Sequence, residues 1–174
     1  MDTKHHSIPC SVTIPVKQFI LLEECPAAWK ELDLYIVRDE SSVFYVGQSY
    51  QAFNRVWDHI KNGYKARSEV GLFILCNCPK SMNFQIELLS SQAEEFAEVE
   101  NNVLRAEEML IKRYKPCFNI SQNSDPSTIP ECYFPPSSSI RSPRSLIRMR
   151  YQAEQSILND NRKKWMEEWI ETPG

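Results

Sequence analysis

The chain has 174 residues, with 20 Lys and Arg against 23 Asp and Glu, so its formal net charge is −3. This length predicts one compact domain with extensions, and the hydrophobic fraction of 42% is ordinary for a soluble globular protein. No apolar run is long enough to span a bilayer, and residues 1–9 are polar, without the apolar core of a signal peptide. We therefore expect a cytoplasmic protein.

The charges and the cysteines bear on whether the protein binds nucleic acid and whether it holds a zinc or redox site. A net acidic chain is not typical of a dedicated nucleic-acid-binding protein, but here the charges are segregated, so a basic surface could still bind phosphate. The segregated groups are acidic Glu94, Glu95, Glu98 and Glu100, basic Lys112, Arg113 and Lys115, and basic Arg141, Arg144, Arg148 and Arg150. None of the six cysteines forms a Cys-x-x-Cys pair, which indicates structural thiols rather than a zinc or redox site.

Residues 1–31 form an N-terminal extension that we expect to pack on the core. Within it, Val12, Ile14 and Val16 alternate with Thr13 and Pro15. Proline is tolerated in a sheet only at an edge or a strand end, so this pattern predicts an edge strand.

Two short apolar segments, Leu32–Val37 and Val43–Gly47, each predict a strand with a tyrosine inside it. A hairpin with a three-residue loop at 39–41 would place Tyr35 opposite Tyr45, so that both hydroxyls project from one face. A four-residue loop would put the two tyrosines on opposite faces unless a bulge intervened.

The next segment predicts a helix that begins at Ser49, a good N-cap residue, and ends at Gly63. An apolar stripe at helical spacing runs along one face and consists of Phe53, Val56, Trp57 and Ile60. Gln51, Arg55 and His59 share the other face, one turn apart, so we expect them to point outward.

Val70–Cys78 is almost entirely apolar and rich in β-forming residues, and it predicts a third, central strand that ends at Pro79. Residues 81–95 fit either a strand or a helix. The whole pattern predicts an α+β fold, with a small three-stranded antiparallel sheet flanked by helices, an N-terminal extension and a C-terminal helical tail.

Glu98–Tyr114 predicts the clearest helix of the chain, and Pro116 ends it. Its buried stripe is expected to contain Val103, Leu104, Leu110, Ile111 and Tyr114. Glu107 lies inside this stripe. A carboxylate aimed at a core is costly unless it is paired or bound to a metal.

The last third of the chain divides into two parts. Residues 121–145 are rich in serine and proline, and they predict a linker or a loop draped over the surface. A helical pattern resumes over 146–174 and carries Trp165 and Trp169 one turn apart. We expect these tryptophans to pack on the core, with a dimer contact as the alternative.

The spacing of the polar residues resembles that of the GIY-YIG nuclease family. The matching positions are Tyr35, Tyr45, Arg55 and His59, followed by Glu-x-x-Leu-Ile-x-x-x-x-Pro-x-x-Asn from Glu107 to Asn119. The resemblance covers residues 32–120, about half of the chain. Leu34 stands where the family's first triplet has glycine, and Gln48 stands where many relatives have lysine.

The resemblance implies a nuclease domain over residues 32–120 that hydrolyses phosphodiester bonds with one Mg²⁺ or Mn²⁺ ion. The implied catalytic residues are Tyr35, Tyr45, Arg55, His59, Glu107 and Asn119. Tyr35 would be the base, with Tyr45 beside it, and Arg55 would stabilise the charge on the phosphorane. Glu107 would hold the metal, His59 would orient water or phosphate, and Asn119 would position Glu107 or nearby backbone.

We expect DNA contacts from the end of the second strand and from the basic groups, because such contacts give affinity without sequence information. The candidate residues are Gln48, Ser49, Lys112, Arg113, Lys115, Arg141, Arg144 and Arg148.

The resemblance favours a small stand-alone restriction-type or mobile-element endonuclease, which would favour a homodimer if it cut both strands. The alternatives are a structure-specific repair or recombination nuclease, a non-catalytic nucleic-acid-binding module on the same fold, and a structural or protein-binding domain. Taken singly, the site residues also fit structural roles, as sheet aromatics, a solvated helix face, a buried ion-pair partner and a turn asparagine.

Overall fold

The computed structural model describes residues 9–63, 65–139, 143 and 145–171. These residues contain four strands, five α-helices and three short 3₁₀ helices. In chain order they are β1 (Ser11–Pro15), α1 (Val16–Leu21), η1 (Ala27–Trp29), β2 (Leu34–Arg38), β3 (Val43–Gln48), α2 (Ala52–Gly63), α3 (Glu69–Cys76), η2 (Lys80–Asn83), β4 (Gln85–Leu89), η3 (Glu94–Val99), α4 (Val103–Tyr114) and α5 (Leu146–Glu171).

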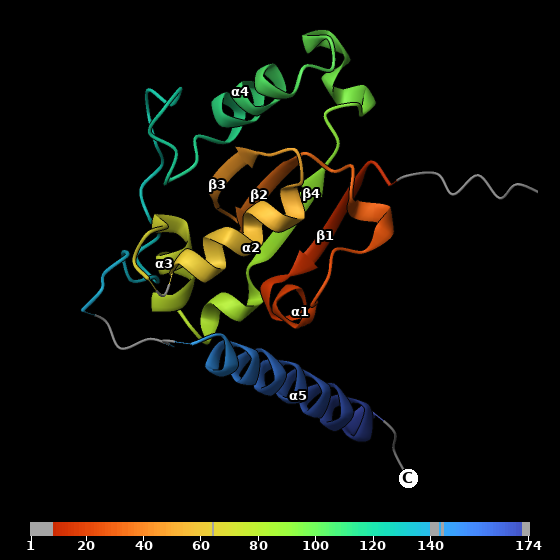
Figure 1. Cartoon of the computed structure of the whole chain (residues 1–174). Coiled ribbons are helices and arrows are strands. Elements are labelled where there is room, and N and C mark those ends of the chain that lie inside the picture. Colours follow the sequence, from red (N-terminus) through yellow and green to blue (C-terminus); the bar gives the residue numbers. More distant parts are fainter. Residues whose placement is uncertain (1–8, 64, 140–142, 144, 172–174) are drawn as a thin grey trace, which may run out of the picture.

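The four strands form one antiparallel sheet in the order β1-β4-β2-β3 (Figure 1). The α+β class is therefore confirmed, but the sheet has four strands instead of three. The predicted edge strand is confirmed as β1, which pairs with β4 from Ser11↔Leu89 to Pro15↔Gln85. The segment that fitted either a strand or a helix supplies β4.

The predicted third strand is wrong, because residues 69–76 form helix α3. Ser68 caps this helix by accepting a hydrogen bond from the Gly71 N–H. Most side chains of α3 are buried, and a helix buried on nearly all sides loses the alternating pattern that would separate it from a buried strand. Tertiary packing thus overrides the β-propensity of Val70, Phe73 and Ile74.

Alternating residues of β2 divide the core between the two faces of the sheet. Tyr35 and Val37 join a cluster that includes side chains from α1, α2, α3 and α5. Leu34 and Ile36 join a second cluster with α4 and Phe96 of η3. The sheet is therefore covered on both faces, with α4 and α2 on opposite sides of β3 (Figure 1).

Helix α4 begins at Val103, later than the predicted start at Glu98. Glu100 and Asn101 have left-handed backbones, with φ of 59° and 52°, and the Asn102 side chain caps the helix by accepting from the N–H groups of Leu104 and Arg105. The predicted buried stripe is wrong at Leu104, which is 55% exposed. Within α4 the fully buried residues are Ala106, Leu110 and Ile111.

The described part of segment 121–145 contacts the core through Tyr133. Tyr133 packs its ring against Phe44, Phe73 and Phe84 and donates a hydrogen bond to Asp39 Oδ2 at 2.7 Å. This contact ties the segment to the turn of the β2–β3 hairpin.

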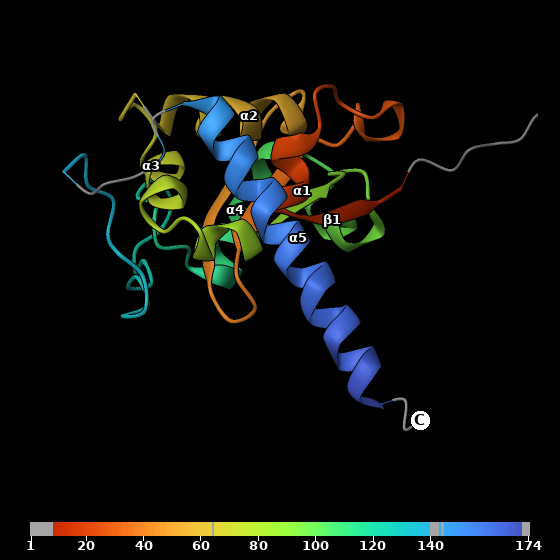
Figure 2. The ribbon, with the colours of Figure 1, turned by 90° about the horizontal axis from the view of Figure 1, so that it is seen from below.

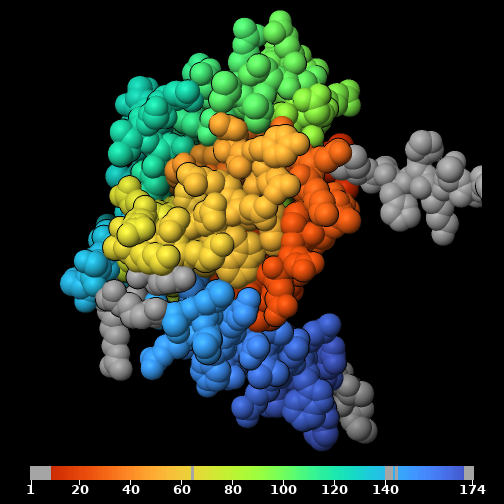
Figure 3. Space-filling model, viewed as in Figure 1, coloured from red at the N-terminus to blue at the C-terminus, as the bar shows by residue number. Residues whose placement is uncertain are grey.

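The two halves of α5 differ in their surroundings. Met149 and Ala153 are fully buried, α5 contacts α1, and an ion pair joins Lys17 to Asp160. Beyond that point the helix continues away from the body (Figures 2 and 3). Trp165 and Trp169 are 55% and 71% exposed, so the expectation that they pack on the core is wrong.

Two further findings concern the cysteines and the helices. All six cysteines are free. Among the described residues, none of the helices has the length and apolar character needed to cross a membrane.

Candidate active site

The β2–β3 hairpin brings the two tyrosines to one face by the second of the predicted routes. Its turn has four residues, Asp39 to Ser42, and the register shifts between Val37 and Arg38. Tyr35 therefore lies opposite Gly47, while Tyr45 lies opposite Val37, so the tyrosines are not paired directly, as a three-residue loop would have required. The bulge nevertheless returns both to the same face, with ring centroids 6.0 Å apart.

Gly47 is required by the position of the Tyr35 ring. A Cβ atom at residue 47 would lie 2.4 Å from both Cζ and Oη of Tyr35. Real Cβ atoms do not approach so closely, so any other residue here would displace the ring. The glycine thus lets the phenol of Tyr35 pack against the backbone of the neighbouring strand.

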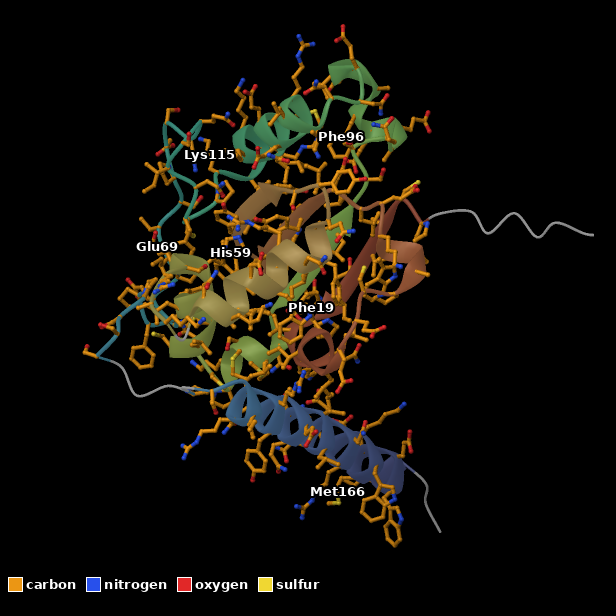
Figure 4. All side chains as sticks on the ribbon, viewed as in Figure 1. Phe19, His59, Glu69, Phe96, Lys115 and Met166 are labelled. Atoms are coloured by element: carbon orange, nitrogen blue, oxygen red, sulfur yellow. The ribbon has the colours of Figure 1, made fainter. Side chains whose placement is uncertain are left out.

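His59 connects the sheet to two helices and does not point outward as expected. Its Nε2 lies 2.9 Å from the Tyr35 hydroxyl, and its Nδ1 lies 2.8 Å from Ser68 Oγ. Ser68 Oγ in turn accepts the Gly71 N–H at 3.1 Å. The ring also packs against Tyr45, with centroids 5.2 Å apart, and Figure 4 shows it on the central helix of the molecule.

The environment keeps this group of side chains neutral. Burial raises the pKa of Tyr35 well above its usual value, and Tyr45 adds to the rise while Arg55 opposes it. Burial also lowers the pKa of His59 to about 4, helped by the positive charge of Arg55 and opposed by Asp58. Burial and the nearby charge of Glu107 raise the pKa of Tyr45. At neutral pH, therefore, the two phenols and the imidazole carry no charge.

Arg55 is exposed, and it lies at the mouth of the group. Together with Tyr45 and His59 it lines a pocket of about 350 Å³, which Asn62, Arg67, Ser68, Glu69, Val70 and Phe118 complete. The pocket thus combines two guanidinium groups with one accessible phenol, which is a suitable lining for a phosphate group.

Glu107 on helix α4 lies near enough to Tyr45 for its charge to raise the pKa of that phenol. The carboxylate is half-buried, and burial raises its pKa while a hydrogen bond from the Gln48 N–H lowers it. In the described part of the chain, no lysine, arginine or histidine lies within ion-pair distance of it. A half-buried carboxylate without a cation is costly, as the sequence indicates, and it retains the capacity to bind one.

Asn119 acts on the backbone of β3. Its side chain accepts the Val46 N–H at 2.9 Å and donates to the Val46 carbonyl at 2.8 Å. The Phe118 N–H donates to the Phe44 carbonyl at 2.9 Å. Since β3 is an edge strand, these bonds close its outer side beside Tyr45, so Asn119 holds nearby backbone instead of contacting Glu107.

The candidate DNA contacts are scattered. Gln48 and Ser49 line a second pocket at the end of β3, and Ser49 Oγ accepts the Gln51 N–H at 3.4 Å, although α2 itself begins at Ala52. The exposed cations Arg113 and Lys115 form ion pairs with Glu95 at 3.7 Å and Asp125 at 3.2 Å. The other cations are Lys112 and Arg148, which are exposed, and Arg141 and Arg144, which lie outside the described residues.

Sequence reasoning missed Ser68 and Arg67, because it assigned the segment after them to a strand. Both residues lie between α2 and α3, next to Arg55 and His59. A signal existed, since serine followed by Glu69 and a run of apolar residues also fits a capped helix start.

A divalent cation fits this site only with one protein ligand. Among the described residues, no group of three or more His, Cys, Asp or Glu side chains could hold a metal. Glu107 by itself supplies an oxygen ligand without a competing ion pair. Mg²⁺ suits such a site, because it keeps several waters and often binds through one carboxylate and phosphate oxygens.

Comparisons with protein-family models, with curated proteins and with solved structures find no match for this chain. Its function must therefore be argued from the residues and their geometry.

Proposed function

We propose that this protein is a metal-dependent endonuclease that hydrolyses phosphodiester bonds in DNA, of a small restriction or mobile-element type. The observation that carries the proposal is the convergence of Tyr35, Tyr45, Arg55 and His59 on one side of β3 with Glu107 on the other. Residues from β2, β3, α2 and α4 meet here, at the spacing that resembles the GIY-YIG family.

Glu107 is the residue that would hold Mg²⁺ or Mn²⁺, and the bound cation would polarise the phosphate and stabilise the leaving oxygen. Arg55 would bind the phosphate and stabilise the charge that develops on it, since its fork of N–H donors matches phosphate oxygens. Arg67 would add a second guanidinium on the same wall of the pocket.

Proton transfer would begin at Tyr45, which lines the pocket, while Tyr35 is only 1% exposed. The high pKa of Tyr35 makes a resting tyrosinate costly. The distance of 2.9 Å between the Tyr35 hydroxyl and His59 Nε2 favours a role in which Tyr35 passes a proton on to His59. Asn119 would keep Tyr45 in place through its bonds to the next residue, Val46.

The test is cleavage of supercoiled plasmid and phage DNA with Mg²⁺, beside Arg55→Ala and Glu107→Gln variants and an EDTA control. Discrete bands that the variants and EDTA abolish would support a sequence-specific endonuclease. Cutting only of branched or flapped substrates would move the assignment to a structure-specific repair or recombination nuclease. Binding without cleavage of any of these substrates would favour a non-catalytic module and overturn the proposal.

A homodimer through the end of α5 would let such an enzyme cut both strands. Large apolar side chains are exposed there, among them Trp165, Met166 and Trp169, and Met166 points away from the body (Figure 4). Basic residues 162–164 precede acidic residues 167 and 168. An antiparallel pair of helices centred between Trp165 and Met166 would place each basic block beside the partner's acidic block. A monomeric mass in light scattering, at micromolar concentration, would contradict this arrangement.

A further inference from the structure

The hydroxyl of Ser68 serves two structural elements at once. It caps α3 by accepting the Gly71 N–H at 3.1 Å, and it lies 2.8 Å from Nδ1 of His59 on α2. Ser68 is buried, with 9% of its surface exposed. The contact therefore replaces water at this nitrogen of the imidazole ring.

We propose that Ser68 is a positioning residue that fixes the orientation and the tautomer of His59, so that Nε2 can accept the proton of the Tyr35 hydroxyl. The catalytic part of this inference rests on the proposed nuclease function. The positioning part concerns the hydrogen bonds alone and can be tested separately.

The direction of the hydrogen bonds follows from the chemistry of the partners. A phenol is a much stronger hydrogen-bond donor than a serine hydroxyl. The Tyr35 O–H therefore donates to His59 Nε2 across 2.9 Å. The remaining proton of the neutral ring then lies on Nδ1 and is donated to Ser68 Oγ.

Ser68 cannot drift away from His59, because the two helices are in backbone contact beside it. A Cβ atom at Gly71 would lie 1.9 Å from the carbonyl oxygen of His59 and 3.0 Å from Cα of Gly63. Glycine at residue 71 thus allows the first turn of α3 to rest on α2. The cap of α3 is held at one fixed distance from the imidazole.

This arrangement allows a proton to pass from the attacking water to His59. The attacking water gives a proton to the Tyr45 oxygen as Tyr45 gives its own to the Tyr35 oxygen, and Tyr35 gives its proton to Nε2 of His59. The water becomes the hydroxide that attacks phosphorus, and His59 becomes an imidazolium whose Nδ1–H remains bonded to Ser68. The charges that act on His59 are those of Arg55 and Asp58 on α2, and Arg67 and Glu69 line the same pocket.

The first experiment is NMR of ¹⁵N-histidine-labelled protein at neutral pH. The chain has three histidines, so a His59→Gln variant assigns the resonances of His59. We expect a single Nδ1–H tautomer in the wild type and mixed tautomers in Ser68→Gly, with Ser68→Thr as the control that keeps the hydroxyl. Glycine is a suitable replacement because it retains most of the helix-capping preference. An unchanged tautomer in Ser68→Gly would overturn the positioning claim, whether or not the protein cuts DNA.

The second experiment measures cleavage by the same full-length variants. We expect kcat of Ser68→Gly to fall roughly 10-fold to 100-fold at unchanged KM, and Ser68→Thr to recover most of it. If Ser68 acts through His59, adding Ser68→Gly to His59→Gln should cost less than about 2-fold more. Full additivity of the two losses would overturn the catalytic part. A wild type that cuts no DNA would overturn the proposed function, and the NMR result would then decide the positioning claim by itself.

Discussion

The side chains on the two sides of Tyr45 differ in how firmly other protein atoms hold them. On the side of α2, His59 is hydrogen-bonded to Tyr35 and to Ser68, so its ring has little freedom. On the side of α4, Glu107 is half-buried, and no described cation pairs with it. The protein thus fixes the proposed proton-transfer groups with its own atoms, while its carboxylate keeps the capacity for an external ligand. Substitutions on the two sides should therefore fail in different ways.

Glu107→Gln should produce the largest loss on the open side. We expect cleavage to fall by about 1,000-fold or more, because the amide cannot replace a carboxylate as a ligand for Mg²⁺. Stability should not fall, since the half-buried charge is removed. Cleavage kinetics and thermal unfolding of the variant check both statements. Glu108→Gln, one residue along the same helix, is the matched control. Equal cleavage rates for the wild type and Glu107→Gln would contradict the assignment of Glu107 as the metal ligand.

Gly47→Ala should disturb the fixed side most strongly. The added Cβ would lie 2.4 Å from the Tyr35 hydroxyl oxygen, so the ring must move away from His59. We expect a loss of about 3 kcal/mol in the free energy of unfolding, within the range for overpacked cores, together with loss of cleavage. Urea unfolding measures the stability. A variant with wild-type stability and activity would show that the Tyr35–His59 contact is dispensable.

Asn119→Ala should destabilise the outer edge of β3, the strand that carries Tyr45. It removes two hydrogen bonds and leaves the N–H and carbonyl of Val46 without these partners. We expect a loss of roughly 2 kcal/mol, measured by urea unfolding, and faster amide exchange at Val46. Asn159→Ala, an exposed residue on α5, is the control and should change stability little. Exchange at Val46 as slow as in the wild type would argue against this role.

The pH dependence of stability should show a smaller effect of His59. Its pKa is lowered to about 4 in the folded state by burial and by Arg55, whereas an unfolded histidine titrates near 6.5. Between these values the unfolded chain binds more protons, so stability rises with pH and is lost as pH falls from 6.5 to 4. After allowance for its partial exposure, we expect His59 to contribute roughly 2 kcal/mol.

His59→Gln isolates this contribution from the carboxylates. The pKa values of Glu87 and Glu107 are raised by burial, so these groups oppose the trend in the same window. The difference in unfolding free energy between wild type and His59→Gln should therefore change by that amount between pH 6.5 and 4. A constant difference across this range would contradict the buried, neutral state of His59.

The site could be assembled from the sequence only in part. The spacing of Arg55 and His59 on an amphipathic helix, and of Glu107 inside an apolar stripe, follows from helical periodicity, which is local. The contact between His59 and Tyr35 depends instead on how α2 lies across the sheet. Local periodicity predicts a solvent-facing His59, whereas its ring is half-buried between β2 and α3.

The α3 segment shows a second kind of limit. Its residues favour a strand by propensity, but Ser68 and the contact of Gly71 with α2 stabilise a helix there. The missed helix also concealed Ser68 as a neighbour of His59. Likewise, Trp165 and Trp169 fit a buried face by composition, yet α5 extends beyond the core that could cover them.

The sequence by itself determined the α+β class, the edge strand around residues 12–15, helix α2 with its buried stripe, and the unusual position of Glu107. These features depend on periodicity, on proline and on the cost of burying charge, all of which act between near neighbours. The tertiary structure decided the bulge that returns Tyr35 and Tyr45 to one face, the helical state of α3 and the hydrogen bonds that hold His59 and Asn119. Those outcomes depend on which distant segments meet, and the free energy of such contacts is not contained in any local pattern.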